Sequence, residues 1–347
     1  MIGGMLTRIR LVVGLALAVT GVALWAVAVT VLVPAAQKGD AAAMAGPDTV
    51  LDPDTMGVLA AWVHDLRWAA IVVVACGLAL TARGSAVWKP AVPAVCGMAL
   101  VIADGAFDAA DATGWGAAAI ACGVALAIVS TAVAVLRARE SMDRPRWPLI
   151  YGIVAAWCSP LLLTNLHDEE SPVVPAGLPA GVGVAQALLV FAAFACAAFS
   201  VSHIPPRAVP AAAGFAAVLG AAGILSGGNA AVLSATLLGG PLIAVVVLLT
   251  GPPRSVRRYL TFVAIATVAY PFLVSASLIV GVGPAWAALA LSGDSYLAEG
   301  VGVAMPGGIL AGAVAGVLTV RARARRPVVA VSTGMDSHLI TDGDAAR

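Results

Sequence analysis

The chain of 347 residues is 61% hydrophobic, only 11% of its residues are charged, and its formal net charge is +1. Soluble globular domains carry about 25% charged residues, so this composition excludes a soluble globular protein. It predicts an all-α integral membrane protein, because a segment that crosses lipid must satisfy its own backbone hydrogen bonds.

The first apolar segment, residues 11–33, follows a basic N-terminus in the order typical of a secretory signal sequence. A signal sequence has an apolar core of about 7–15 residues, and this segment is longer. Residues 33–35 also form a poor cleavage site. We therefore expect the segment to be the first transmembrane helix.

Ten apolar segments are each long enough to cross a bilayer as a helix, for which about 20 residues are needed. The alternating strands of an outer-membrane barrel are absent from the pattern. We predict a polytopic helix bundle that forms a single transmembrane domain over residues 1–326, with an extracytoplasmic loop over 34–65 and a disordered cytoplasmic tail over 327–347. The expected spans cover residues 11–33, 66–82, 91–109, 114–136, 147–165, 182–201, 208–225, 229–250, 259–281 and 301–320.

The distribution of charge among the loops predicts the orientation. With the N-terminus inside, 17 of the 19 Lys and Arg residues fall on the inner side, and only Lys38 and Arg67 fall outside. Thirteen of the 18 Asp and Glu residues fall on the outer side. Because cytoplasmic loops are enriched in Lys and Arg, we expect both termini of this multi-pass protein on the cytoplasmic side of the cell membrane. The Ala-, Gly-, Val- and Arg-rich composition is typical of GC-rich bacteria.

Three acidic residues, Asp104, Asp108 and Asp111, follow the short apolar run 90–103. This run is shorter than a full span, so Asp104 and Asp108 are expected within the outer third of the membrane. On a continuous helix the three carboxylates fall within an arc of about 60°. Intramembrane acids usually face a bundle interior or a water path, which favours cation binding or a proton relay. The alternative is an early helix exit that leaves the acids solvated in the loop.

Two His-Asp dipeptides, His64-Asp65 and His167-Asp168, are expected at the outer membrane surface. Histidine and carboxylate together can hold a divalent metal ion. Their spacing fits no known ligand motif, however, and the alternative is that both are solvated loop charges.

Proline and glycine interrupt the later apolar segments at residues 239–241, 270–271 and 305–308. Many transporters use discontinuous helices to expose backbone groups to substrate. The alternative is simple kinks, since Pro and Gly are more frequent in membrane helices generally. The apolar segment 284–291 is too short to cross and is expected to be an interfacial or re-entrant helix. The residues predicted to line a solute path are Pro241, Tyr270, Pro271, Ser275, Pro306 and Gly307.

Several absences exclude function classes. The four histidines lie at span ends, in loops or in the tail, so no pair can ligate a haem between helices. There is no GxxxxGK[ST] loop for a nucleotide. No cofactor is predicted. The five cysteines show no zinc-ligand spacing and are interpreted as core residues: Cys76, Cys96, Cys122, Cys158 and Cys196.

These patterns favour a permease for a small solute, with cation coupling through the Asp cluster. The alternative is a non-catalytic membrane accessory or scaffold protein, or the permease subunit of a larger complex, in envelope assembly or export. An enzyme acting on a lipid-linked substrate ranks last, because the outer loops supply few groups for substrate specificity. The expected partners are the lipid bilayer, a small solute or cation and a membrane protein, but no nucleic acid.

Overall fold

The structure is a computed structural model in which every regular element of the described part of the chain is a helix. The all-α prediction is therefore confirmed for this part. It comprises residues 2–35, 61–84, 86–138, 146–163, 178–201, 228–249, 256–292 and 304–324, with the isolated positions 210, 214, 217 and 218. Most of the expected loop 34–65, most of the expected span 208–225 and the tail 327–347 lie outside the described residues.

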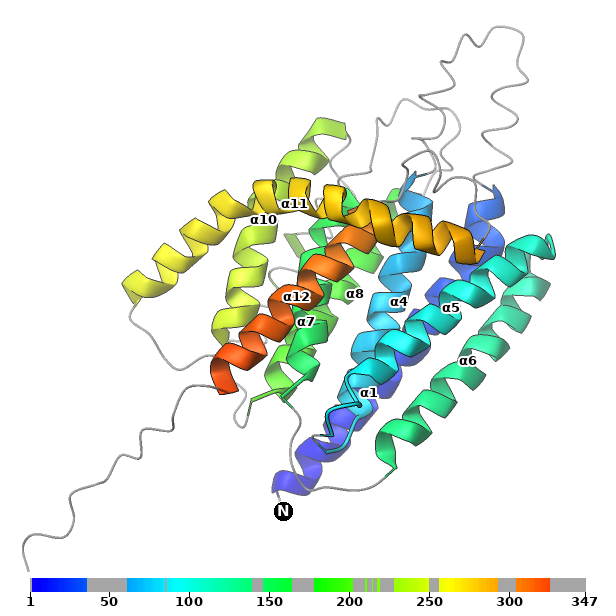
Figure 1. The fold of residues 1–347 in the computed structure, drawn as a ribbon, viewed down its shortest axis with the longest axis horizontal. Coiled ribbons are helices and arrows are strands. Elements are labelled where there is room, and N and C mark those ends of the chain that lie inside the picture. The colour runs from blue at the N-terminus through cyan, green and yellow to red at the C-terminus, as the bar shows by residue number, and fades with distance from the viewer. Residues whose placement is uncertain are drawn as a thin grey trace, which may run out of the picture.

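The helices pack as a bundle in which most axes run in a common direction (Figure 1). α5 begins and ends at the residues expected for the third span, and α6, α8 and α10 differ from their expected spans by a few residues at each end. The elements are α1 (Ile2–Val27), the π-helical turn η1 (Ala28–Leu32), α4 (Ala61–Thr81), α5 (Ala91–Ala109), α6 (Trp115–Arg137), α7 (Pro148–Cys158), the 3-10 turn η2 (Pro160–Leu163), α8 (Leu178–Phe199), α10 (Gly228–Leu249), α11 (Val256–Ser292) and α12 (Ala304–Ala324).

Five stretches of the described chain are long and apolar enough to cross a membrane. Three shorter apolar helical stretches accompany them, at Pro148–Leu162, Leu237–Leu248 and Leu260–Ala276. So many apolar helices indicate a membrane-embedded protein. The five stretches are Gly4–Ala35, Ala91–Ala109, Trp115–Arg137, Val182–Phe199 and Ala304–Ala324.

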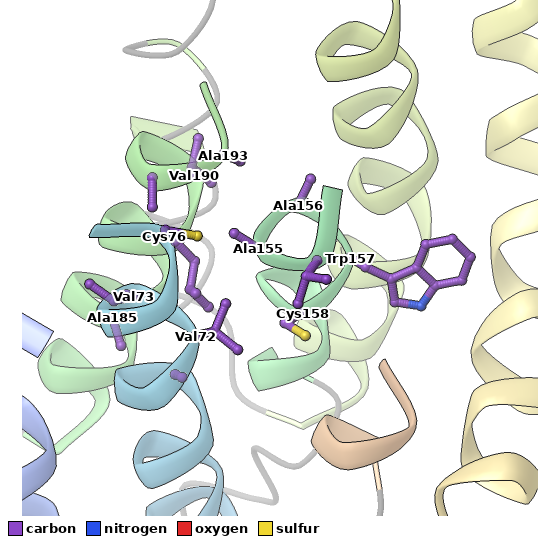
Figure 2. Packing of buried hydrophobic residues seen from close by; sticks show 14 of the residues in the cluster. Val72, Val73, Cys76, Ala155, Ala156, Trp157, Cys158, Ala185, Val190 and Ala193 are labelled. Carbon is purple, nitrogen blue, oxygen red and sulfur yellow. The ribbon is translucent and has the colours of Figure 1, made fainter. Parts of the chain in front are cut away.

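α4 lies at the centre of the bundle and separates two clusters of buried side chains. One face of α4, with Val72 and Cys76, packs against α7 and α8, and we call this contact region the α7/α8 seam (Figure 2). The opposite face, with Ala70 and Val74, packs against α1, α5 and α6, and we call this region the α1/α5 seam. Both faces of α4 are therefore buried, which leaves little of this helix for lipid.

Small residues allow the closest helix contacts, as expected where helices associate within lipid. In α1, a Cβ added to Gly14 would lie 2.8 Å from the carbonyl oxygen of Gly77 in α4. In α12, a Cβ added to Gly312 would lie 2.8 Å from the Cα of Val154 in α7. A Cβ added to Gly316 would lie 2.8 Å from the Cα of Ile150, also in α7. Glycine at these positions lets the two pairs of backbones approach.

The C-terminal ends of α4, α6 and α10 lie at the lower end of the bundle in Figure 1, and basic side chains of neighbouring elements bind them. Arg10 of α1 donates hydrogen bonds to the carbonyl oxygens of Ala79 and Ala82 at 3.3 and 3.0 Å. Arg323 of α12 donates to Val247 in the last turn of α10 at 2.6 Å. Cations favour helix C-termini because unpaired carbonyls carry partial negative charge there.

Lys89 is the most deeply buried of these cations. Its Nζ donates to the carbonyl oxygen of Arg83 just past the end of α4, and to those of Leu136 and Ala138 at the end of α6 at 3.0 and 3.3 Å. Only 2% of the residue is exposed. One ammonium group therefore ties the ends of two helices to the start of α5.

α11 is a single helix of 37 residues that lies across the other helices (Figure 1). It runs through Pro271, and it includes the segment 284–291 that we expected to form a separate interfacial or re-entrant helix. That expectation was wrong: the segment continues α11. The helix remains continuous at Pro271 and Pro284, because the turns before and after each proline keep their helical hydrogen bonds.

Candidate functional site

A buried ion pair joins α4 to α5 in the α1/α5 seam. Nη1 of Arg67 lies 2.8 Å from Oδ2 of Asp104 and donates a hydrogen bond to it. The two residues are only 6% and 7% exposed, so the pair is largely removed from solvent. Charged groups in such surroundings require a partner, and these two residues supply one to each other.

The three predicted acids do not share one environment. Asp104 is buried, Asp108 is exposed one helical turn later, and Asp111 is exposed beyond the end of α5. The expected stack of three carboxylates on one helix face is therefore not formed, because α5 ends at Ala109. Only Asp104 enters the bundle interior.

The chain leaves α5 through a Schellman motif, which explains the position of Asp111. The amide of Ala112 donates to the carbonyl of Phe107 at 3.0 Å, and that of Asp111 donates to Asp108 at 2.9 Å. Asp111 has a φ of 46°, the left-handed conformation that this motif requires at its C′ position. This turn directs Asp111 away from the helix axis that Asp104 and Asp108 share.

α1 contributes aromatic packing and a π-helical turn to the α1/α5 seam. The rings of Trp25 and Phe107 meet edge to face with centroids 6.4 Å apart, and Phe107 lies one turn beyond Asp104 on α5. After Trp25, the π-helical turn η1 carries the buried Thr30, whose carbonyl accepts a hydrogen bond from Gly114 at 2.7 Å. π-helical turns are rare and often occur at functional sites.

The two His-Asp dipeptides differ from the expectation in one respect. Asp65 is fully buried on α4, at 0% exposure, so it is not a solvated loop charge. The side chain of His64 and both residues of the second dipeptide, His167 and Asp168, lie outside the described residues. Within the described part of the chain, no group of three or more His, Cys, Asp or Glu side chains is arranged to hold a metal ion.

The residues predicted to line a solute path lie in helices that are not interrupted at those points. Pro241 lies inside α10, Pro271 inside α11, and Pro306 in the first turn of α12, where a proline removes no helical hydrogen bond. Gly307 is buried in that same turn. Continuous helices agree with the alternative, in which proline and glycine permit bends and close packing.

Two of the predicted path residues have well-defined contacts. Tyr270 is buried, its ring packs against Gly239 of α10, and its hydroxyl donates to the carbonyl of Trp157 in α7 at 3.3 Å. Ser275 is exposed and donates to the carbonyl of Pro271 one turn earlier at 3.1 Å. Tyr270 thus links α11 to α7, whereas the Ser275 hydroxyl makes a hydrogen bond within α11.

No protein-family model matches the chain. Comparison with curated proteins and with solved structures also finds no match.

The buried polar residues that sequence reasoning missed include Arg67, Ser159 and Gln186. A signal existed for Arg67, because it is one of only two basic residues on the acidic side of the predicted topology. Gln186 is a long amide in the middle of the apolar helix α8, which is a comparable signal. Ser159 follows the last residue of α7, Cys158, and precedes the helix-breaking Pro160.

Proposed function

We propose that the protein is a cation-coupled permease for a small solute, in which Asp104 is the coupling carboxylate and Arg67 is its internal counter-ion. The observation that carries the proposal is the 2.8 Å ion pair between α4 and α5, buried among apolar helices. Ionisable residues inside a membrane protein are rare, and they commonly belong to ion pathways or proton relays.

The energetics of the pair favour a switching role over a stabilising one. Burying two charges costs several kcal/mol per ion, roughly as much as their attraction returns, and well-packed apolar side chains often stabilise a protein as well or better. A protein that needed only a helix contact here would gain as much from leucine. The pair offers two states, since a proton on Asp104 removes its charge and weakens its hold on Arg67.

The mechanism follows from that two-state contact. When Asp104 is ionised, the ion pair holds α5 against α4. When Asp104 binds a proton, Arg67 needs a new acceptor, which a solute with a negative or polar group supplies. Asp108 and Asp111 lie toward the end of α5, where exposed carboxylates raise the local cation concentration. The coupling energy is the difference in affinity for the solute between these two states.

The proposal includes the ten-span topology with both termini in the cytoplasm. Arg10, Lys89 and Arg323 support it, because they bind the C-terminal ends of α4, α6 and α10. These three helix ends lie on one side of the bundle (Figure 1). On this topology Asp104 and Arg67 lie toward the extracytoplasmic side of a bacterial cell membrane, within reach of an external cation.

The test is transport by purified protein in liposomes that contain the pH indicator pyranine, with gradients of amino acids, sugars and small carboxylates applied in turn. We expect at least one gradient to drive proton movement through the wild type. Asp104→Asn should abolish proton movement and leave downhill exchange of that solute intact. Asp104→Glu should restore part of the coupling, and Thr131→Val, which changes an exposed hydroxyl on α6, should behave as wild type.

Proton movement through Asp104→Asn at the wild-type rate would exclude Asp104 as the coupling group. If no gradient drives any movement and a pull-down returns one stoichiometric membrane protein, the permease proposal fails. The accessory or scaffold function is then the better description.

A further inference from the structure

The helices α4, α7 and α8 contact one another at two heights along their axes in the α7/α8 seam, which we call the first and the second level. At the first level the thiol of Cys76 donates to the carbonyl of Tyr151 at 3.4 Å, and the thiol of Cys196 lies 3.8 Å from the carbonyl of Cys76. At the second level the hydroxyl of Ser159 lies 3.4 Å from the carbonyl of Gln186. Figure 2 shows Cys76 and Cys158 within this seam.

The helical rise places Asp65 at the second level. Asp65 precedes Cys76 by 11 residues on α4, and Gln186 precedes Cys196 by 10 residues on α8. At 1.5 Å per residue these separations are about 16 and 15 Å, so the two side chains lie at nearly the same height. Eleven residues also return to nearly the same helix face, so Asp65 faces the seam as Cys76 does. Leu66 and Ala69, which lie within one turn of Asp65 on α4, belong to the same buried cluster as Cys158 of α7.

α7 ends at this level. Its last residue is Cys158, and the chain continues after Ser159 as the 3-10 turn Pro160–Leu163. Proline has no amide hydrogen, so Pro160 cannot satisfy the helical carbonyl of Ala156. A helix C-terminus carries partial negative charge, and α7 ends inside the bundle at the height inferred for Asp65.

Gln186 adds an unused acceptor at the same place. Its Nε2 donates to the carbonyl of Ser159 at 3.3 Å, which fixes the orientation of the amide group, because an amide oxygen in that position would face another oxygen. The other end of the amide, Oε1, is fully buried and has no hydrogen-bond partner. A buried oxygen with no donor is destabilised relative to a satisfied one, so the site favours a ligand with positive charge.

We propose that Asp65, Ser159 and Gln186 form a sodium-binding site at the C-terminal end of α7, between α4 and α8. The Asp65 carboxylate supplies the formal charge. Oε1 of Gln186 and the Ser159 hydroxyl, which keeps lone pairs after donating to Gln186, supply neutral oxygens. This inference goes beyond the proposed function and does not depend on it, since the ion would bind whether or not a solute is carried.

The chemistry of the ligands selects the ion. Oxygen-only ligands suit hard cations. A divalent ion would leave uncompensated charge in a low-dielectric interior, which is costly, because the site has one carboxylate among its three ligands. Unwound ends of membrane helices are a common place for sodium ions in transporters, and the break after Cys158 supplies such an end.

The test is direct binding of radioactive sodium to the purified full-length protein in detergent, together with thermal unfolding in NaCl and in choline chloride at equal ionic strength. We expect saturable binding to the wild type and a higher Tm in NaCl than in choline chloride. Asp65→Asn should abolish saturable binding. Gln186→Met, which keeps the side-chain volume but removes the oxygen, should weaken it about tenfold. Thr131→Val should bind as wild type does.

Three results would overturn the proposal. They are the absence of saturable binding to the wild type, equal Tm values in the two salts, and undiminished binding to both Asp65→Asn and Gln186→Met. If Asp65→Asn does not fold, Gln186→Met and the wild-type measurements decide the question. Sodium binding with no coupled transport would overturn the proposed function alone, and proton-coupled transport with no sodium binding would overturn this site alone.

Discussion

Asp65 and Arg67 lie two residues apart on α4 but face opposite sides of this helix. Arg67 donates to Asp104 of α5, whereas Asp65 lies on the same face of α4 as Cys76, which packs against α7 and α8. Two helical steps turn the chain by about 200°, so one acid and one base within a single turn face two different contact regions. Because both faces of α4 are buried, a change in the partner of either charge alters how α4 packs on that side.

Replacing both members of the ion pair with apolar residues should cost little stability, whereas replacing only one of them should cost much more. Asp104→Leu and Arg67→Met should each lower the free energy of unfolding by about 3–5 kcal/mol, because each leaves one buried charge uncompensated. The double variant should return to within about 1 kcal/mol of the wild type. Thermal and denaturant unfolding in detergent would measure this coupling. A double variant less stable than both single variants would contradict it.

Lys89 should stabilise the ends of α4 and α6 through its hydrogen bonds more than through its charge. Lys89→Met removes three donors from buried carbonyls, and we expect a loss of about 2–3 kcal/mol in unfolding free energy. Arg137→Gln, which removes a positive charge from the last turn of the same α6, should cost less than about 1 kcal/mol. Hydrogen exchange at residues 132–138 should rise in the first variant only. Equal losses of unfolding free energy in the two variants would show that Lys89 stabilises these helix ends through its charge alone.

The contact between α12 and α7 should not tolerate even one added methyl group. Gly312→Ala places a Cβ 2.8 Å from Val154, and overpacking of this kind costs about 1–3 kcal/mol. The matched control is Gly123→Ala on α6, where no atom lies within 4 Å of the added Cβ. That variant should be neutral or more stable by up to about 1 kcal/mol, because alanine favours helix. A lower Tm for Gly123→Ala than for Gly312→Ala would contradict the packing.

Replacing Asp111 with glycine should stabilise the protein. Its φ of 46° disfavours a side chain, so Asp111→Gly should raise the unfolding free energy by about 1 kcal/mol. Asp111→Asn controls for the loss of charge and should change little, because asparagine also tolerates this conformation. Ala110→Gly, at a φ of −88°, should instead destabilise the protein. A stabilisation by Asp111→Asn equal to that by Asp111→Gly would assign the effect to charge.

The predicted topology is open to a simple test. Reporter fusions after residues 110 and 140 flank α6 and should report opposite faces of the membrane, with 140 in the cytoplasm. A periplasm-active phosphatase and a cytoplasm-active fluorescent protein serve as the two reporters. Both fusions on the same face would invalidate the proposed ten-span arrangement.

Local pattern predicted much of the helical structure correctly. The apolar run 91–109 has no competing turn signal before its acids, and α5 occupies those residues. The break expected between 281 and 284 did not form, because neighbouring helical turns carried α11 through its prolines. The three acids were expected on one face, but the Schellman turn at Asp111 ended the helix first. Helix ends and continuity depend on packing that a single segment does not encode.

The sequence by itself determined that this is an all-helical, membrane-embedded chain, since hydropathy and segment length are properties of each segment alone. Only the tertiary structure decided which buried polar groups meet. Arg67 and Asp104 are 37 residues apart in sequence, and Ser159 and Gln186 are 27 apart. The physical reason is that the energy of a buried charge or amide depends on its neighbours in space, and the packing of α4 between its two seams selects those neighbours.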